Sequence, residues 1–261
     1  MDGNDHFDLD AYKPANMARM AEQSGVAKAN MVLPQLFVLG TLAGAFIAFG
    51  ALFYLLTVTD SGLGYGPTRL LGGVAFSLGL ILVVVAGAEL FTGNNLIVLA
   101  YAHGQIPMLA MLRNWGVVYV ANLVGSLIMV VAALASGILD GAMGETAVAV
   151  AKGKAGLSPF EALVRGILCN TLVCLAVWLS YAARRVSGKV LAIVFPIAAF
   201  VALGFEHSVA NMFLMPLGLI LADMPVLAPT IANLVPVTIG NIIGGAGFVA
   251  ATYWFCYLKD R

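Results

Sequence analysis

Charged residues are scarce in this 261-residue chain, in which Asp, Glu, Lys and Arg together make up 10%. A soluble domain carries about 25% charged residues, so the composition argues against a water-soluble protein. The 13 basic residues are balanced by 13 acidic ones, which leaves no net charge. Without a basic surface the chain cannot neutralise a phosphate backbone, and we expect no nucleic-acid partner.

Cysteine and histidine are also rare, with three residues of each. Cys169, Cys174 and Cys256 lie in apolar runs, and an odd, lipid-embedded set does not indicate a disulfide framework. A Cys-X4-Cys spacing without neighbouring histidines is a poor metal signature. We therefore expect three small apolar core residues, no metal and no cofactor.

Hydrophobic residues make up 61% of the chain and gather in long runs. A helix needs about 20 apolar residues to cross about 30 Å of hydrocarbon. Runs of that length occur at Leu33–Val58, Leu70–Leu99, Ala110–Leu139, Phe160–Ala183, Val190–Leu221 and Ile231–Tyr257. We predict an all-α membrane protein whose residues 31–261 form a single six-span transmembrane domain with short connections.

The first 30 residues are polar and lack the basic start and apolar stretch of a signal peptide. Pro14 suits the start of a helix and Gly25 suits its end, and an apolar stripe lies between them. We predict that residues 1–30 form an amphipathic segment lying against the cytoplasmic face of the membrane. A disordered tail is the alternative.

Lysine and arginine in the connections predict the orientation of the spans. Nine basic residues fall on the side of the two termini: Lys13, Arg19, Lys28, Arg113, Arg184, Arg185, Lys189, Lys259 and Arg261. Four fall on the other side: Arg69, Lys152, Lys154 and Arg165. The excess indicates a multi-pass protein of the cytoplasmic (inner) membrane with both termini in the cytoplasm.

Two polar motifs recur at nearly one offset. Glu89 and Glu206, each followed by an asparagine, are 117 positions apart, and Asn122 and Asn241 are 119 positions apart. A repeat of three spans crosses the membrane an odd number of times, so its second copy enters from the opposite side. We therefore predict two inverted three-helix repeats, with helices 2 and 5 broken and a solute path between the breaks.

Glu89 and Glu206 would each cost about 2.5 kcal/mol or more if they were charged and faced lipid. They could carry solute or protons, or they could accept hydrogen bonds from backbone N–H groups that the breaks set free. Because both copies of the repeat contain the glutamate, although only one path runs between them, we favour the structural role.

His207 has no counterpart, since Leu90 holds the equivalent position in the first repeat. An imidazole titrates near physiological pH, at about 6.5 when unperturbed, so His207 can give a hydrogen bond or a proton to a weak acid in transit. A neutral histidine bonded to a carbonyl at the break is the alternative. Thr92 could orient the imidazole or could bond to its own helix. We expect His6 and His103 to be surface residues.

Five stretches resemble the formate/nitrite transporter family, and the resemblance extends along nearly the whole chain. They are PANMARMAE at 14–22, AELFTGN at 88–94, GILCNTLVCLAVW at 166–178, FEHSVANMF at 205–213 and PVTIGNIIGG at 236–245. The resemblance implies an aquaporin-like subunit of a homopentamer in the lipid bilayer, with one pore in each subunit. The connection at 222–230 is shorter than in the enterobacterial formate channel, which implies a differently shaped outer vestibule.

The resemblance also implies roles for single residues. His207 matches the family's central histidine, and Thr92 matches its partner on the break. Apolar constrictions that flank the histidine are implied at Phe76, Leu80, Leu90 and Phe200. In the vestibule, Lys154 and Asn241 match a periplasmic-side pair thought to attract the anion, and Asn170 matches a further motif residue.

We therefore predict a channel, not an enzyme, for a small monovalent weak-acid anion, with formate as the expected substrate. His207 would protonate or hydrogen-bond the anion between two hydrophobic constrictions, with protons as a second partner. Nitrite and hydrosulfide are the alternatives within the family, and acetate is a further possible anion. The alternative from another class is the membrane-anchor subunit of a redox enzyme, but haem ligation normally needs several intramembrane histidines. A channel for neutral solutes would be expected to carry paired Asn-Pro-Ala motifs, which this sequence lacks.

Overall fold

The computed structural model describes residues 11–259, where the regular elements are helices apart from one β-bridge between Ala11 and Ala183. The helices are α1 (Pro14–Ala29), α2 (Leu33–Val58), α3 (Tyr65–Ala86), η1 (Gly93–Ile97), α4 (Val98–Ala102), α5 (Met108–Ala135), α6 (Ala142–Ala155), α7 (Pro159–Ala182), α8 (Val186–Leu203), α9 (Ser208–Leu221), α10 (Leu227–Ile242), η2 (Ile243–Ala251) and α11 (Thr252–Tyr257). Within the described part of the chain, six helices are long and apolar enough to span a membrane: α2, α3, α5, α7, α8 and the continuous α10–α11.

Most predicted spans agree with these helices, and the first agrees in both bounds. The third differs, because α5 ends at Ala135 whereas the apolar run continues to Leu139. Gly137 follows with a φ of 73°, a left-handed conformation that ends a helix irrespective of hydrophobicity. The sixth contains a π-helix, η2, that the apolar pattern did not indicate.

The two predicted breaks are present, and each begins at a glycine. Gly87 caps the C-terminus of α3 with a φ of 85°, and Gly204 caps α8 with a φ of 74°. Only glycine adopts this left-handed region without a steric cost, so the two positions stop their helices. After each break the chain continues as short helices, η1–α4 in the first repeat and α9 in the second.

The N-terminal helix begins at Pro14, as predicted, but it runs through Gly25 and ends at Ala29. A Cβ atom on Gly25 would lie 3.2 Å from the Cβ of Ala100 in α4. The glycine therefore permits close packing of α1, and it does not terminate the helix.

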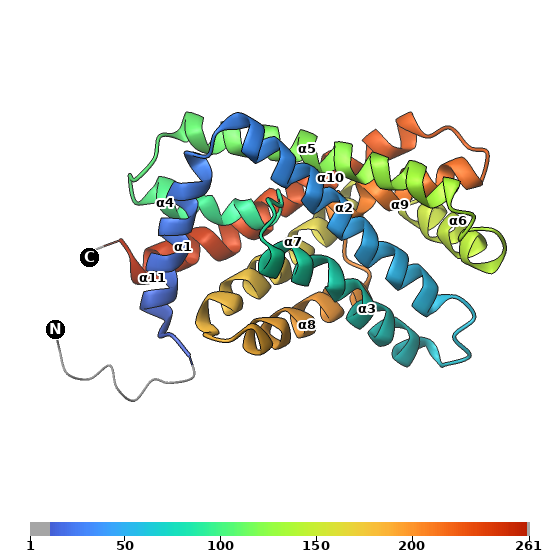
Figure 1. The fold of residues 1–261 in the computed structure, drawn as a ribbon, viewed down its shortest axis with the longest axis horizontal. Coiled ribbons are helices and arrows are strands. Elements are labelled where there is room, and N and C mark those ends of the chain that lie inside the picture. The colour runs from blue at the N-terminus through green and yellow to red at the C-terminus, as the bar shows by residue number, and fades with distance from the viewer. Residues whose placement is uncertain (1–10, 260–261) are drawn as a thin grey trace.

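A helix that we did not predict, α6, occupies what we expected to be a connection. It is too short and too polar to be found as an apolar run. It precedes α7 as α1 precedes α2, so each inverted repeat begins with a short helix. Figure 1 shows α1 near α11 at one end of the molecule and α6 at the opposite end, with the long helices running between them.

Small residues bring the helices of each repeat together in the same way. A Cβ on Gly125 would lie 1.9 Å from the carbonyl oxygen of Thr41, where α5 crosses α2. A Cβ on Gly240 would lie 2.3 Å from the carbonyl oxygen of Leu163, where α10 crosses α7. These backbone-to-backbone approaches are typical of helix packing in membranes, and they join α2 to α5 and α7 to α10.

Candidate functional site

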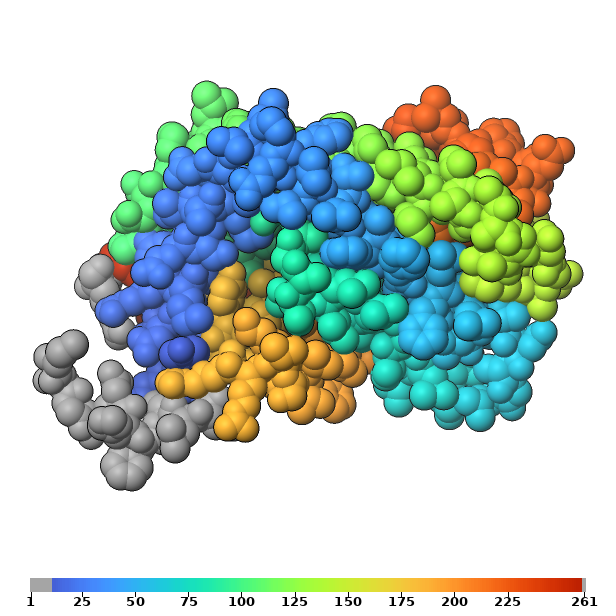
Figure 2. Space-filling view, viewed as in Figure 1, coloured from blue at the N-terminus to red at the C-terminus, as the bar shows by residue number. Residues whose placement is uncertain are grey.

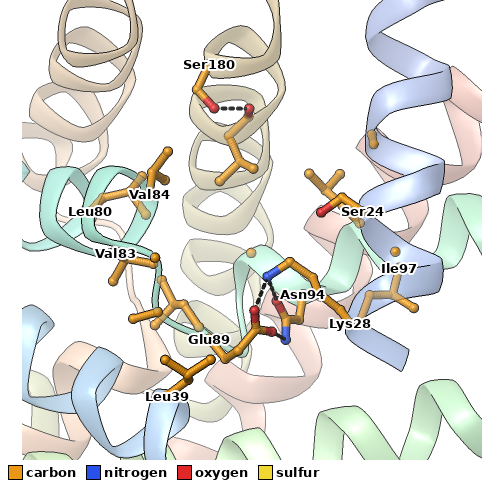
Figure 3. A pocket seen from close by; sticks show the side chains of 18 of the residues that line it. Ser24, Lys28, Leu39, Leu80, Val83, Val84, Glu89, Asn94, Ile97 and Ser180 are labelled. Carbon is orange, nitrogen blue, oxygen red and sulfur yellow. Dashed lines mark hydrogen bonds and ion pairs between the residues drawn. The ribbon is translucent and has the colours of Figure 1, made fainter. Parts of the chain in front are cut away.

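The first break carries a polar cluster around Glu89. Its carboxylate accepts a 2.6 Å hydrogen bond from the Lys28 ammonium and a 2.8 Å bond from the Asn94 amide. Asn94 also donates to Asn114, which in turn donates to the carbonyl oxygen of Lys28. In Figure 3 the side chains of Lys28, Glu89 and Asn94 point toward one another. The cluster ties α1 and α5 to the break.

The second break carries the same cluster around Glu206. Its carboxylate accepts a 2.9 Å hydrogen bond from Lys154 on α6 and a 2.6 Å bond from Asn211. Asn211 also donates to Asn233, which donates to the carbonyl oxygen of Lys154. The two copies share these four contacts, so Lys154 on α6 is the counterpart of Lys28 on α1. They differ in one contact, because Lys28 also donates to the Asn94 amide oxygen, whereas the Asn211 amide oxygen has no hydrogen-bond partner within residues 11–259.

Buried asparagines satisfy the backbone at the breaks. Asn122 donates to the carbonyl oxygens of Glu89 and Gly40 and accepts from the N–H of Phe91. We expected the glutamate carboxylates to accept from backbone N–H groups, but they accept from side chains. The asparagine amide bonds to these backbone groups because it can donate and accept hydrogen bonds at once, which a carboxylate cannot.

Asn241 repeats this arrangement in the second break. It donates to the carbonyl oxygens of Glu206 and Gly166 and accepts from the N–H of Ser208. The family resemblance paired Asn241 with Lys154. The two residues do not bond directly, but both bind Glu206: Asn241 donates to its carbonyl oxygen and Lys154 donates to its carboxylate.

His207 and Thr92 bring the two breaks together. The Nε2 atom of His207 lies 2.9 Å from the Thr92 hydroxyl oxygen, and Nδ1 accepts a hydrogen bond of 3.1 Å from the N–H of Ala210. Since Nδ1 is an acceptor, the proton of the neutral ring is on Nε2, which donates to Thr92. The imidazole thus caps α9 with one nitrogen and presents a donor at the other, and Thr92 bonds across the interface instead of to its own helix.

Two cavities approach this pair from opposite sides. The first, about 370 Å³, is lined by Lys28, Glu89 and Lys189, and we call it the Lys28 vestibule. The second, about 490 Å³, is lined by Lys154, Glu206 and His207, and we call it the Lys154 vestibule. In Figure 2 the surface is hollowed beside α1, between it and the segments that follow α3 and α7.

Each vestibule lining includes two of the predicted apolar constriction residues. Leu80 and Leu90 line the Lys28 vestibule, as Figure 3 shows for Leu80. Phe76 and Phe200 line the Lys154 vestibule, and their ring centroids lie 5.7 Å apart in an edge-to-face contact. Phe76 and Leu80 are one helical turn apart on α3, a rise of about 6 Å, and we call the four apolar side chains together the apolar layer.

Phe200 also contacts the histidine. Its ring is stacked on that of His207, with centroids 5.9 Å apart and planes 18° apart. Phe76, Phe200, His207 and Thr92 therefore form one connected cluster, in which an imidazole donor lies against an aromatic ring.

Comparison with known proteins identifies the family. The formate/nitrite transporter family matches residues 15–255. The chain is 42% identical to the formate channel FocA of Escherichia coli K12, over 100% of this chain and 99% of the relative. A pentameric formate channel with formate bound has a TM-score of 0.79 and 41% identity, covering 87% of this chain and 98% of the other. An FNT family ion channel has a TM-score of 0.81 and 31% identity, covering 93% and 98%.

The chain belongs to the formate/nitrite transporter family. Its family and relatives are transporters, so the chain is a multi-pass membrane transport protein, not an enzyme. The alternative of a redox-enzyme anchor is thereby set aside. The predicted fold, with six spans, inverted repeats and two broken helices, agrees with the solved structures of the family.

Lys28 is one of the residues at the breaks of this transporter that sequence reasoning missed. We placed it in an amphipathic segment lying against the cytoplasmic face of the membrane, whereas its ammonium group lines a vestibule and binds a buried carboxylate. The signal was present in the sequence: Lys28 and Lys154 each lie close before the first span of a repeat. We overlooked it because we began the repeats at the spans and left out α1 and α6.

Several residues of the transporter lie elsewhere than expected. Asn170 and Asn241 are fully buried and are not among the vestibule linings; Asn170 donates to the carbonyl oxygens of Thr92 and Asn241. Cys169 and Cys174 are buried, but Cys256 is exposed because α11 presents it outward.

His103 also differs from expectation. It is partly buried and pairs with Glu22 of α1, whereas we expected a surface residue. His6, which we expected to be a surface residue as well, lies outside the described part of the chain.

Proposed function

We propose that this transporter is a channel for formate, which passes His207 between two apolar constrictions. The observation that carries the proposal is the hydrogen bond between His207 and Thr92 at the point where two cation-lined vestibules approach each other. The names of the relatives, formate channels at about 40% identity, support formate as the substrate.

Each part of the path has a physical task. A bare anion in a low-dielectric slit loses several kcal/mol of hydration, so the apolar layer is the barrier. Lys154 and Lys28 offset part of that cost at the two entrances by attraction. Phe76, Phe200 and the two leucines exclude the hydrated ions that could otherwise follow.

His207 stabilises the anion as a hydrogen-bond donor. Its Nε2–H, which points to Thr92, turns to the formate oxygen that arrives. Transfer of a proton from a neutral imidazole would leave an imidazolate, so a proton relay requires prior protonation of Nδ1. That protonation would break the hydrogen bond from Ala210 and uncap α9. The geometry therefore favours hydrogen bonding over protonation of the anion, the two roles that the sequence left open.

The proposed setting is a homopentamer in the inner membrane, as in the pentameric relative, with both termini in the cytoplasm. Residues 31–261 form the channel domain, and residues 1–30 form the cytoplasmic segment whose α1 supplies Lys28. The Lys154 vestibule then faces the periplasm. The variant Lys152→Cys, at an exposed position on α6, checks this orientation when intact cells are treated with a cysteine reagent that does not cross the membrane. Labelling of that cysteine only in broken cells would indicate the opposite orientation.

The test of the proposal is formate flux into liposomes that contain the purified protein. Wild type conducts formate, His207→Phe conducts at least about tenfold less because it cannot donate, and His207→Gln keeps most of the flux because its amide donates without titrating. The same measurement between about pH 5.5 and 8 separates the two histidine roles. A relay predicts that the glutamine variant loses both rate and pH dependence.

Substrate choice needs its own comparison. Formate, nitrite, hydrosulfide and acetate are measured side by side at equal gradients. A formate flux above the other three supports the proposal, and a dominant nitrite or hydrosulfide flux would replace the substrate while keeping the channel. An unchanged formate rate in His207→Phe at every pH would remove His207 from the path.

A further inference from the structure

The two repeats differ in charge at one vestibule position. The N–H of Glu206 donates to the carbonyl oxygen of Arg165, and the N–H of Glu89 donates to that of Leu39. The carbonyl oxygen of the next residue also has an equivalent partner in each repeat: Gly166 accepts from the Asn241 amide, and Gly40 accepts from the Asn122 amide. Arg165 therefore occupies in the second repeat the place that Leu39 occupies in the first.

This difference is located at the surface of the cavities. Arg165 lines the Lys154 vestibule, whereas Leu39 lines the Lys28 vestibule (Figure 3). His207 and Leu90 differ between the repeats in the same manner, and His207 is the residue on which the proposed conduction depends. A departure from the repeat at a cavity wall therefore points to function, since the repeated contacts already account for the fold.

A second guanidinium meets Arg165 at the end of α8. Arg69 donates to the carbonyl oxygens of Val201 and Ala202 at 3.1 and 2.7 Å, and its Nη2 would lie 2.9 Å from a Cβ on Gly204. Arg165 approaches the carbonyl oxygen of the same glycine at 3.5 Å. The two cations thus converge on Gly204.

The charges around this point are unbalanced. Lys154, Arg69 and Arg165 line the vestibule together with one carboxylate, Glu206, which already pairs with Lys154. Among the described residues, no carboxylate lies within ion-pair distance of either guanidinium. Glu161, one turn before Arg165, is exposed and is bonded to the Ser158 cap.

We propose that Arg165, supported by Arg69, forms an anion-binding site in the Lys154 vestibule that captures a planar two-oxygen anion from that side before it enters the apolar layer. The inference rests on the proposed anion conduction. The Nε and Nη2 donors of Arg69 bond to carbonyl oxygens at the end of α8. Arg165 donates only through Nη1, in a 3.5 Å contact, so its planar guanidinium can still donate two parallel hydrogen bonds to a carboxylate. Binding there relieves the repulsion between the two guanidinium groups.

The site makes the channel asymmetric. Formate current is measured across a planar bilayer while its concentration is varied on one face at a time. In wild type, the half-saturating formate concentration is lower on the face with the Lys154 vestibule than on the other face. Arg165→Leu raises it about fivefold or more on that face and changes it less than about twofold on the other. Leu39→Arg places the charge in the other repeat and lowers the half-saturating concentration on the opposite face.

Two further variants keep the test decisive. Arg165→Lys retains the charge but loses the paired guanidinium donors. Its half-saturating concentration should therefore rise to an intermediate value for formate and stay unchanged for hydrosulfide, which has no pair of oxygens. Lys152→Gln removes an exposed cation from α6 outside the vestibule lining and changes neither face. If Arg165→Leu does not fold, the lysine variant alone decides, because an unchanged half-saturation for formate overturns the site.

The outcome is separable from that of the proposed function. A wild type that carries no formate current contradicts the formate channel itself. A wild type that conducts with equal half-saturation on the two faces, or that is unaffected by Arg165→Leu, contradicts only the asymmetric anion site.

Discussion

The ammonium group of Lys28 donates a 2.6 Å hydrogen bond to the buried carboxylate of Glu89, and this contact ties the N-terminal helix to the first break. The side chain of Lys28 is 26% exposed and that of Glu89 is 7% exposed, so the pair lies at the edge between the vestibule and the protein interior. The same pair recurs in the second repeat as Lys154 and Glu206. The short helices α1 and α6 therefore each fix the break of their own repeat.

Removing Lys28 should destabilise the protein because it leaves the Glu89 carboxylate buried without its cation. We expect Lys28→Met to lower the free energy of unfolding by about 2 kcal/mol, less than for a fully buried pair because solvent reaches the lysine. Glu89→Gln in the same background should recover part of the loss. Thermal unfolding in detergent of both single variants and the double variant measures the coupling, and strictly additive losses would contradict an interaction between the two residues.

Asn241 should be needed for the second break to form. Asn241→Ala leaves the carbonyl oxygens of Glu206 and Gly166 and the N–H of Ser208 without their buried partner, which we expect to cost about 2 kcal/mol or more. The unfolding midpoint should fall accordingly. Thr57→Val is the control, because that hydroxyl bonds only to its own helix at Phe53. A midpoint as high as in the control would show that water replaces the amide at the break.

The glycines at helix crossings should not tolerate even a methyl group. Gly125→Ala places a Cβ about where the carbonyl oxygen of Thr41 already lies, so we expect a loss of about 1–3 kcal/mol. Gly116→Ala on the same helix meets nothing within 4 Å and should be neutral or slightly stabilising. Comparing the unfolding midpoints of the two variants checks the crossing, and equal midpoints would argue against it.

Thr92 should act through its hydroxyl group. Thr92→Val keeps the size of the side chain but removes the partner of the His207 Nε2–H, so the imidazole loses its orientation. We expect formate flux into liposomes to fall about tenfold, the order of one hydrogen bond. Thr92→Ser retains the hydroxyl and should stay within about twofold of wild type. Similar fluxes for the valine and serine variants would mean that His207 is held by other contacts.

The sequence by itself predicted the features that depend on local composition and on period. Apolar runs of about 20 residues predicted the spans, and the recurrence of Glu89 and Glu206 predicted the inverted repeat and the two breaks. Gly87 and Gly204 stop their helices through their own backbone conformation, a local property that any surrounding fold would respect.

Only the tertiary structure decided which polar groups meet. Lys28 and Glu89 are 61 positions apart, and no pattern in the chain paired them. Thr92 and His207 are 115 positions apart, and only the family resemblance paired them, because no periodicity relates residues so far apart. The packing of α1 and α6 against the breaks brings each ammonium group to its carboxylate. The packing of α3 and α7 against the end of α8 brings Arg69 and Arg165 to Gly204. The physical reason is that a buried polar group must find a partner wherever the packed helices bring one within reach.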